Sequence, residues 1–339
     1  MQTESARPHH RSSFPSLWRG VVFTFQAAVA AVAVVAVGAA QAQDEVLQYA
    51  GGERDIEPLT VVTDTTVSAQ LVRDLGEKFV KVESVAEAGQ TPGEVELSEA
   101  DREAIGQADL VVYQGLGLMP GFIAAAEKRD AKDRVVLTER VPEFRLIEDA
   151  EGTVNPYTYL SPSLRQFSVD HLTTRLKKKL EPVAGEIEGN RLRVNIELQS
   201  LDRETDGLLE DVPRSERLLV TDNRVFAYFA KDYHFQLLDV TREADGKKAI
   251  EQINRNETPT VFPVAGIGGG ALEDWLEAHR GKDVPESIGL SKALDALWLG
   301  EPNLPTGTYL GQFRENVSTI LLGLKPLPAA GQESTERLE

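Results

Sequence analysis

Cysteine is absent from this sequence of 339 residues. The chain therefore forms no disulfide bond, so an oxidising compartment is permitted but its chemistry is not used to stabilise the fold. A bacterial lipoprotein anchor is not expected, because that anchor is attached to a cysteine. Stability has to come from a buried core, for which a chain of this length is ample.

Positive charge is scarce. Lysine and arginine number 36 against 54 aspartates and glutamates, which gives a formal net charge of -18. Nucleic acid and anionic membrane surfaces repel a chain with this balance, so neither is expected as a partner. We expect a monomer.

Familiar catalytic motifs are missing as well. The sequence contains no thiol nucleophile, no Gly-x-Ser-x-Gly turn and no His-Glu-x-x-His helix. Nothing in it promotes catalysis, and we expect a binding protein rather than an enzyme.

The first 42 residues have the pattern of an export signal. Arg11 and Arg19 precede an apolar run over residues 21–38, and Ala40-Gln41-Ala42 fits the small-x-small cleavage pattern. We expect cleavage there and a periplasmic protein, with an uncleaved anchor as the alternative, because the apolar run approaches the length of a membrane span. Residues 43–57 are expected to form a flexible lead and residues 326–339 a disordered tail.

Strand and helix patterns alternate twice in the remaining chain. In the first half, the expected strands are residues 59–63, 80–85, 109–113 and 135–137, with helices over 67–78, after Ser98 and over 121–128. Ser98 and Asp101 form an acidic variant of the capping box. In the second half, strands are expected over 217–221, 236–240 and 258–264, with helices over 225–233, 247–255, 271–279 and 308–324.

Between these halves, residues 163–180 and 187–209 are helical with no strand between them. We therefore predict an α/β protein with two Rossmann-like lobes, residues 58–184 and 213–325, joined by a long backbone helix within 185–212. A ligand cleft is expected between the lobes, because ligands of such folds lie at the carboxyl ends of the strands.

Several segments resemble one known family. They are GQTPGEVELSEADREAIGQADLVVYQGLGLMPGF (89–122), PYTYLSP (156–162), LLVTDNRVFAYFAKDY (218–233), TVFPV (260–264) and GTYLGQFRENVSTILLGL (307–324). In order and spacing they are similar to the zinc/manganese class of ABC-transporter solute-binding proteins, from about residue 59 to residue 324. The resemblance implies two lobes, a helical backbone and a buried cation that is handed to a membrane permease.

The chain departs from the family at its metal ligands. Where the family carries histidine, this sequence has Gly93 and Tyr157, and the family's Ser-His-Asp at a strand end is replaced by Asp222-Asn223-Arg224. The family's aspartate before the last helix has Glu286 as its nearest match. Zinc and manganese need imidazole, thiolate or carboxylate donors, so we expect the usual site to be lost or rebuilt.

The histidines of the expected mature chain, His171, His234 and His279, are expected to be solvated at the surface. They lie far apart in the sequence, so we do not expect them to form a metal site together.

Three interpretations of the cleft stay open. In the first, Tyr157 fills an abandoned site with a packed ring. Alternatively, a small anionic or zwitterionic solute binds at the glycine turn before residue 271, where free backbone N–H groups and a helix dipole favour an anion. The residues of that pocket would be Gly266, Gly268, Gly269, Arg224, Asn223, Tyr157 and Tyr159.

The third interpretation keeps a divalent cation, with oxygen ligands from Glu94, Asp222 and Glu286. Outside the receptor class, the alternative is a relative that no longer binds a ligand and acts as an interaction or adhesion scaffold in the envelope. We expect an exported solute-binding component of a metal-type ABC importer, with an inner-membrane permease as its partner and no confidently assigned cofactor.

Overall fold

The computed structural model describes residues 56–149 and 151–324. The expected signal peptide, most of the expected lead and the expected tail lie outside the described residues. Within the described part, no helix combines the length and the apolar character that crossing a membrane requires.

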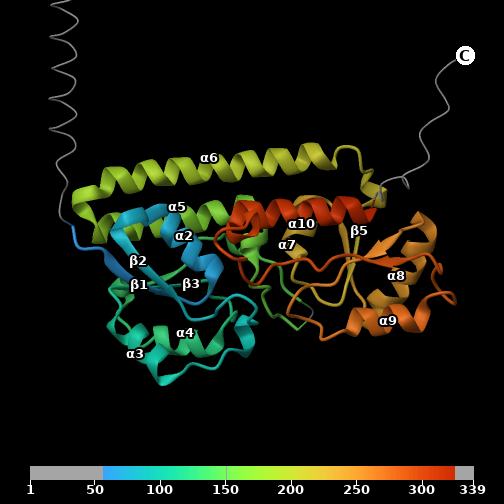
Figure 1. Cartoon of the computed structure of the whole chain (residues 1–339), viewed down its shortest axis with the longest axis horizontal. Coiled ribbons are helices and arrows are strands. Elements are labelled where there is room, and N and C mark those ends of the chain that lie inside the picture. The colour runs from blue at the N-terminus through green and yellow to red at the C-terminus, as the bar shows by residue number, and fades with distance from the viewer. Residues whose placement is uncertain (1–55, 150, 325–339) are drawn as a thin grey trace, which may run out of the picture. The chain divides into compact units, whose positions relative to one another are not determined.

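The first lobe is built on a four-stranded parallel sheet (Figure 1). Its strands are β1 (Leu59–Thr63), β2 (Val80–Ser84), β3 (Leu110–Tyr113) and β4 (Arg134–Val136), in the order β2-β1-β3-β4. All four residues of β3 are buried, which explains its uninterrupted apolar run. The strands predicted from the sequence are confirmed to within two residues at each end.

Three α-helices accompany these strands: α2 (Thr66–Gly76), α3 (Glu99–Gln107) and α4 (Pro120–Ala126). The predicted capping box is confirmed, since the Ser98 hydroxyl accepts from the Asp101 N–H while the Asp101 carboxylate accepts from the Ser98 N–H. Short 3-10 turns fill the connections: η1 (Glu77–Phe79), η2 (Pro92–Glu94), η3 (Ala131–Asp133), η4 (Glu143–Arg145) and η5 (Thr158–Leu160).

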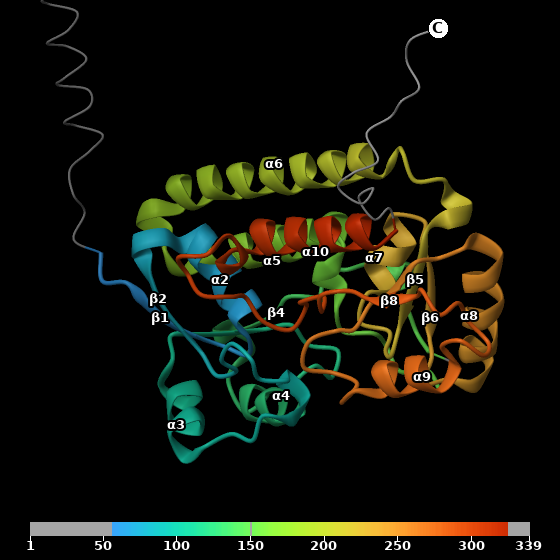
Figure 2. The same ribbon diagram turned by 45° about the vertical axis from the view of Figure 1, so that its right-hand side comes forward.

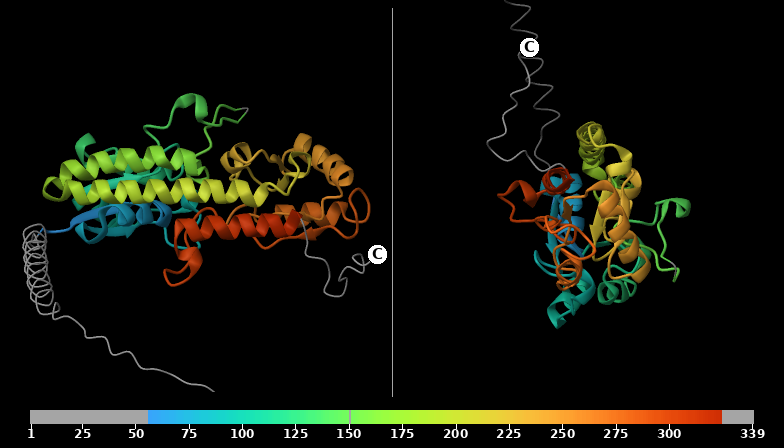
Figure 3. Two further views of the ribbon diagram at one scale, coloured as in Figure 1. Left: turned by 90° about the horizontal axis from the view of Figure 1, so that it is seen from above. Right: turned by 90° about the vertical axis from the view of Figure 1, so that its right-hand side faces the viewer.

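Two long helices link the lobes. Helix α5 (Pro162–Lys179) and the 26-residue helix α6 (Ala184–Leu209) lie side by side, joined by η6 (Glu181–Val183), as Figure 3 shows from above. Helix α6 contacts α2 of the first lobe and α10 (Tyr309–Leu324) of the second. The predicted backbone helix is therefore present.

The second lobe contains two pairs of parallel strands (Figure 2). Strand β5 (Leu218–Thr221) pairs with β6 (Gln236–Asp239), and β7 (Thr260–Val261) pairs with β8 (Gly289–Leu290). The Phe262 N–H donates to the Val220 carbonyl at 2.8 Å, so β7 runs beside β5. The accompanying elements are η7 (Arg214–Glu216), α7 (Ala227–Asp232), α8 (Glu243–Asn256), α9 (Ala271–His279) and η8 (Pro305–Gly307).

Three features of this lobe differ from the prediction. The strand expected over residues 258–264 shortens to two residues, because Pro259 and Pro263 have no N–H to give to a ladder. Helix α8 begins at Glu243 rather than at residue 247. Its first turn carries Glu243 and Asp245, whose negative charges suit the positive end of the helix dipole. Strand β8 was not predicted, since two residues carry no periodic pattern.

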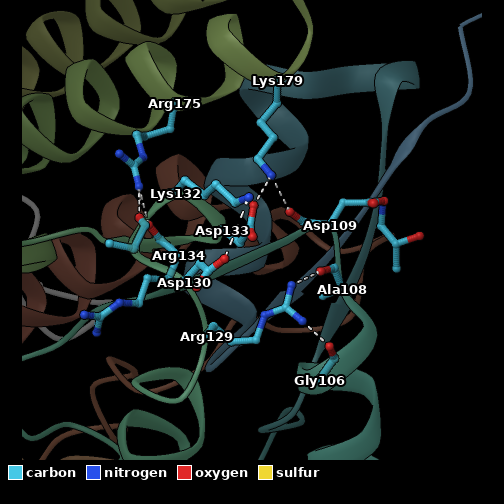
Figure 4. A network of polar contacts seen from close by, with 12 residues as sticks. Gly106, Ala108, Asp109, Arg129, Asp130, Lys132, Asp133, Arg134, Arg175 and Lys179 are labelled. Atoms are coloured by element: carbon cyan, nitrogen blue, oxygen red, sulfur yellow. Dashed lines mark hydrogen bonds and ion pairs between the residues drawn. The ribbon is translucent and has the colours of Figure 1, made fainter.

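A group of charged side chains, here called the amino-end network, closes the end of the first sheet where β3 and β4 begin (Figure 4). Its cations bond to the connections before these strands. Arg129 donates to the carbonyls of Gly106 and Ala108, Arg175 to those of Ala131 and Arg134, and Lys179 to the Asp109 carbonyl and the Asp133 carboxylate. The opposite, carboxyl ends of the strands face the cleft.

Candidate solute-binding cleft

The carboxyl ends of β1 and β5 place one buried aspartate in each lobe. Asp64 directly follows β1, and Asp222 directly follows β5. Strand β1 lies between its parallel neighbours β2 and β3, and β5 has β6 on one side and the β7 segment on the other. Ligands of open parallel sheets bind at such positions, where the chain continues in opposite directions across the sheet. Both carboxylates therefore lie at the carboxyl ends of the strands, where the sequence predicts the ligand cleft.

The segment NPYTYLSP (155–162) connects the two lobes. The side-chain amide of Gln114 donates to the Pro156 carbonyl at 2.9 Å and to Thr158 Oγ1 at 2.8 Å. From the same segment, Asn155 Nδ2 donates to the Arg224 carbonyl of the second lobe at 2.7 Å. The segment is held from both sides, which fixes the position of Tyr157.

The two tyrosines of this segment have different environments. Their rings meet edge to face at 6.2 Å between centroids. Tyr159 is buried and its hydroxyl donates to the Ala296 carbonyl at 2.9 Å, beside Tyr309, so it does not line the two large cavities described below. Tyr157 does line one of them, and its hydroxyl makes no hydrogen bond with the described residues. Burial raises the pKa of the Tyr157 hydroxyl, which keeps it protonated.

Two cavities lie along this edge. The hairpin cavity, of about 430 Å³, is named for the turn in which Glu148 forms an antiparallel bridge with Val154. Residues 147–149 and 153–157 and the ends of β5 and β6 line it. The glycine-loop cavity, of about 800 Å³, is lined by residues 263–270, by Thr91 and Glu94 of the first lobe, and by Glu273 of α9. Asp222 and Ile267 line both cavities, so they mark the junction between the two.

Asp222 lies against the glycine loop. It is 4% exposed, and a Cβ atom on Gly268 would lie 1.8 Å from its Oδ2, so only glycine fits there. Burial raises the pKa of Asp222, while hydrogen bonds from Asn223 and from the backbone of Leu272 lower it in part. The carboxylate thus occupies the start of α9, where an anionic solute was expected to bind.

The other polar candidates near β5 are engaged within the protein. Asn223 donates to Asp222 at 2.7 Å and accepts from the Val225 N–H at 3.0 Å. The Arg224 guanidinium lies 3.4 Å from Asp245. All three residues of the Asp222-Asn223-Arg224 motif nevertheless line the hairpin cavity.

The remaining candidates separate into two groups. Glu94 lines the glycine-loop cavity, next to Thr91, whose hydroxyl donates across the lobes to the Gly266 carbonyl at 2.6 Å. Glu286 is exposed in the turn between α9 and β8, its carboxylate packed beside Gly281, and it lines neither cavity. Gly93 is exposed in η2 and lines neither cavity.

Among the described residues, no group of three or more histidines, cysteines, aspartates or glutamates is arranged to hold a metal ion. The positions at which the family usually carries imidazole have Gly93, Tyr157 and Asn223, which supply no strong donor. The geometry of the cleft accordingly does not fit a bare zinc or manganese ion held by the usual set.

Sequence reasoning missed one buried carboxylate, Asp64, and one half-buried carboxylate, Asp295. Asp64 accepts the Gln114 N–H at 2.8 Å, and burial raises its pKa. Its signal in the sequence was its place directly after a buried strand. Asp295 also precedes the last helix, and burial raises its pKa; Gln312 donates to it at 3.3 Å. Asp295 is directed towards α10 and lines neither large cavity.

The expectation for the histidines is wrong for one of the three. His171 is buried in α5 with its Nε2 3.2 Å from the Glu139 carboxylate, and burial is the main cause that lowers its pKa. His279 is half-buried with its ring stacked on Trp275, whereas His234 is exposed. The apolar positions around His171 on a long helix were the signal for its burial.

Two parallel α/β lobes, helices that span them and cavities at the strand ends define the class of two-lobe solute-binding proteins. A sequence profile described as zinc-uptake complex component A, periplasmic, matches residues 61–322, and the chain belongs to this family.

Individual relatives agree. The manganese-binding lipoprotein MntA of Bacillus subtilis is 27% identical over 284 residues, covering 81% of this chain and 92% of its own length. The zinc-binding protein TroA of Treponema pallidum is 25% identical over 279 residues, covering 80% and 90%. The solved structure of the latter superimposes with a TM-score of 0.71 at 23% identity, over 79% of this chain and 99% of that one, and supports the fold.

Proposed function

We propose that this protein is the exported solute-binding component of an ABC importer and that its cleft has lost the conventional metal cage of its family. One observation carries the proposal. The cleft contains two cavities, of about 430 and 800 Å³, and the smaller one is lined by Tyr157 and Asn223, two of the residues that the resemblance predicts in place of imidazole.

The volumes indicate the size of the solute. A bare divalent cation is held by donors that converge to about 2.0–2.6 Å. Pockets for small molecules have volumes of roughly 300–1,000 Å³. The cavities of this protein fall in that second range, so the solute is larger than a bare ion.

In this proposal, the first lobe spans residues 58–184, the linking helix lies within 185–212, and the second lobe spans 213–325. The two lobes close on the solute in the periplasm and present it to a permease in the inner membrane. The family membership supports a transport role, and the relatives bind metals according to their names.

Elemental analysis and native mass spectrometry test the proposal. The protein is purified from its own compartment without chelator or affinity metal, and we expect less than one equivalent of zinc, manganese or iron. A small organic mass that remains bound in the native spectrum supports a converted cleft. One equivalent of any of the three metals contradicts it.

A matched variant makes the test sharper. Gly93→His, Tyr157→His and Asn223→His together return imidazole to the three positions. In calorimetric titration with zinc, we expect the triple variant to bind more tightly than the natural protein. Equal, stoichiometric zinc binding by both proteins would show that the natural residues already form a metal site.

A further inference from the structure

The glycine-loop cavity is negatively charged throughout. Its described lining includes the carboxylates Glu94, Asp222 and Glu273, and it includes no lysine, arginine or histidine. The cavity therefore offers hydrogen-bond acceptors and negative charge to whatever fills it.

Asp222 is the buried end of this cavity. Within the part of the chain that the structure describes, its partners are the Asn223 amide and the Leu272 backbone, and no cationic side chain forms an ion pair with it. Buried charges in proteins are ordinarily paired, because an unpaired charge loses its solvation without compensation. A positive group in the cavity would supply the missing partner.

The neighbouring hairpin cavity differs in this respect. Besides four carboxylates, its lining contains two arginines, and one of them, Arg224, lies 3.4 Å from Asp245. It also contains the Tyr157 hydroxyl, which has no partner among the described residues. We therefore place the positively charged group of a solute in the glycine-loop cavity and the rest of the solute near the Tyr157 hydroxyl.

Two other classes of solute fit less well. An anion would meet Asp222 at the start of α9, where the carboxylate already receives the backbone N–H of Leu272. A bare metal ion would need three or more converging donors, which the described residues do not provide. An ammonium group has three N–H donors that point in different directions, so separated carboxylates satisfy it.

We propose that the glycine-loop cavity binds the primary ammonium group of a small organic cation, such as a diamine, with Asp222 as its central counter-ion and Glu94 and Glu273 at the rim. This inference rests on the proposed function, because it names the class of solute for the same cleft.

Calorimetric titration of the full chain with 1,4-diaminobutane tests the inference, with succinate as an anionic probe of the same carbon length and zinc chloride as the metal probe. We expect saturable binding of the diamine, no binding of succinate, and weaker binding at high salt. Asp222→Asn should weaken binding about tenfold, because a charge-assisted hydrogen bond to the ammonium group becomes a neutral one.

Three further variants distinguish an effect of the carboxylates that line the cavity from an effect of the protein's overall negative charge. Glu94→Gln and Glu273→Gln are exposed rim changes, and each should weaken diamine binding about two- to fivefold. Glu286→Gln removes an exposed carboxylate that lines neither cavity and should leave the affinity unchanged. If Asp222→Asn fails to fold, the rim variants still decide the matter against Glu286→Gln.

The inference is overturned if the diamine does not bind, if succinate binds in its place, or if Glu94→Gln and Glu273→Gln behave like Glu286→Gln. Its failure can be told apart from that of the proposed function. A bound organic mass without an amine leaves the converted cleft standing and removes the ammonium site, whereas one equivalent of metal removes both.

Discussion

The pKa values of aspartates shift in opposite directions in the amino-end network and in the cleft. In the network, a hydrogen bond from Lys179 is the main cause that lowers the pKa of Asp133, so its charge is stabilised in the fold (Figure 4). In the cleft, burial raises the pKa of Asp64 and of Asp222, neither of which has a cationic partner among the described residues. At one end of the first lobe, ion pairs and hydrogen bonds stabilise the connections between strands. In the cleft, the aspartates lack such pairing, which is common at functional sites.

The largest test of this comparison is Gly268→Ala. A Cβ atom there would collide with the Asp222 carboxylate, and the backbone φ of +92° already disfavours alanine. We expect a loss of about 3 kcal/mol in the free energy of unfolding, measured by urea denaturation. Gly269→Ala is the matched control, because its φ is also positive but its Cβ would meet nothing within 4 Å. It should lose only about 1 kcal/mol; equal losses would show that Asp222 does not fill the loop.

A second test separates the two tyrosines of NPYTYLSP. Tyr159→Phe leaves the buried Ala296 carbonyl without its donor, so we expect a loss of about 1–2 kcal/mol in unfolding free energy. Tyr157→Phe removes a hydroxyl without a partner among the described residues and should change stability by less than about 0.5 kcal/mol. A larger effect at Tyr157 would assign it a structural role.

A third test neutralises the cleft. Asp222→Asn keeps the shape of the side chain and should stabilise the protein at pH 7 by on the order of 1 kcal/mol, since a buried charge is removed. The pKa of Asp222 is raised, so the stability linked to its neutral form is fully present below the ordinary value of 3.8 and is lost as pH rises through the raised pKa. Urea titrations at several pH values should therefore show the advantage of Asn growing with pH. A constant difference would contradict the linkage.

The smallest effect is expected from the same substitution in the network. Asp133→Asn should destabilise the protein at pH 7 by less than about 1 kcal/mol, because the pair with Lys179 is near the surface. The pKa of Asp133 is lowered, so its contribution is present above the unfolded value and is lost as pH falls through the folded value. The two substitutions should change the free energy of unfolding in opposite directions. Changes in the same direction would contradict the proposed difference between the two regions.

The prediction from sequence worked best where local patterns decide the structure. The capping box at Ser98, the buried run of β3 and the long helix α6 follow from propensity and periodicity, and all three are present. It worked less well where distant segments meet. The burial of His171 depends on the packing of α5, and the contact between Asp222 and Gly268 joins residues 46 apart in the chain. Sequence spacing does not predict that a side chain following one strand will lie at the N-terminus of a distant helix.

The hydroxyl of Thr91 spans the opening between the lobes with one bond to the Gly266 carbonyl. A single hydrogen bond near the surface contributes on the order of 1 kcal/mol, which changes an equilibrium about fivefold. Thermal motion breaks such a closure often. We therefore expect the residence time of a bound solute to depend mainly on its own contacts with the cavity walls, and only slightly on the Thr91 hydrogen bond.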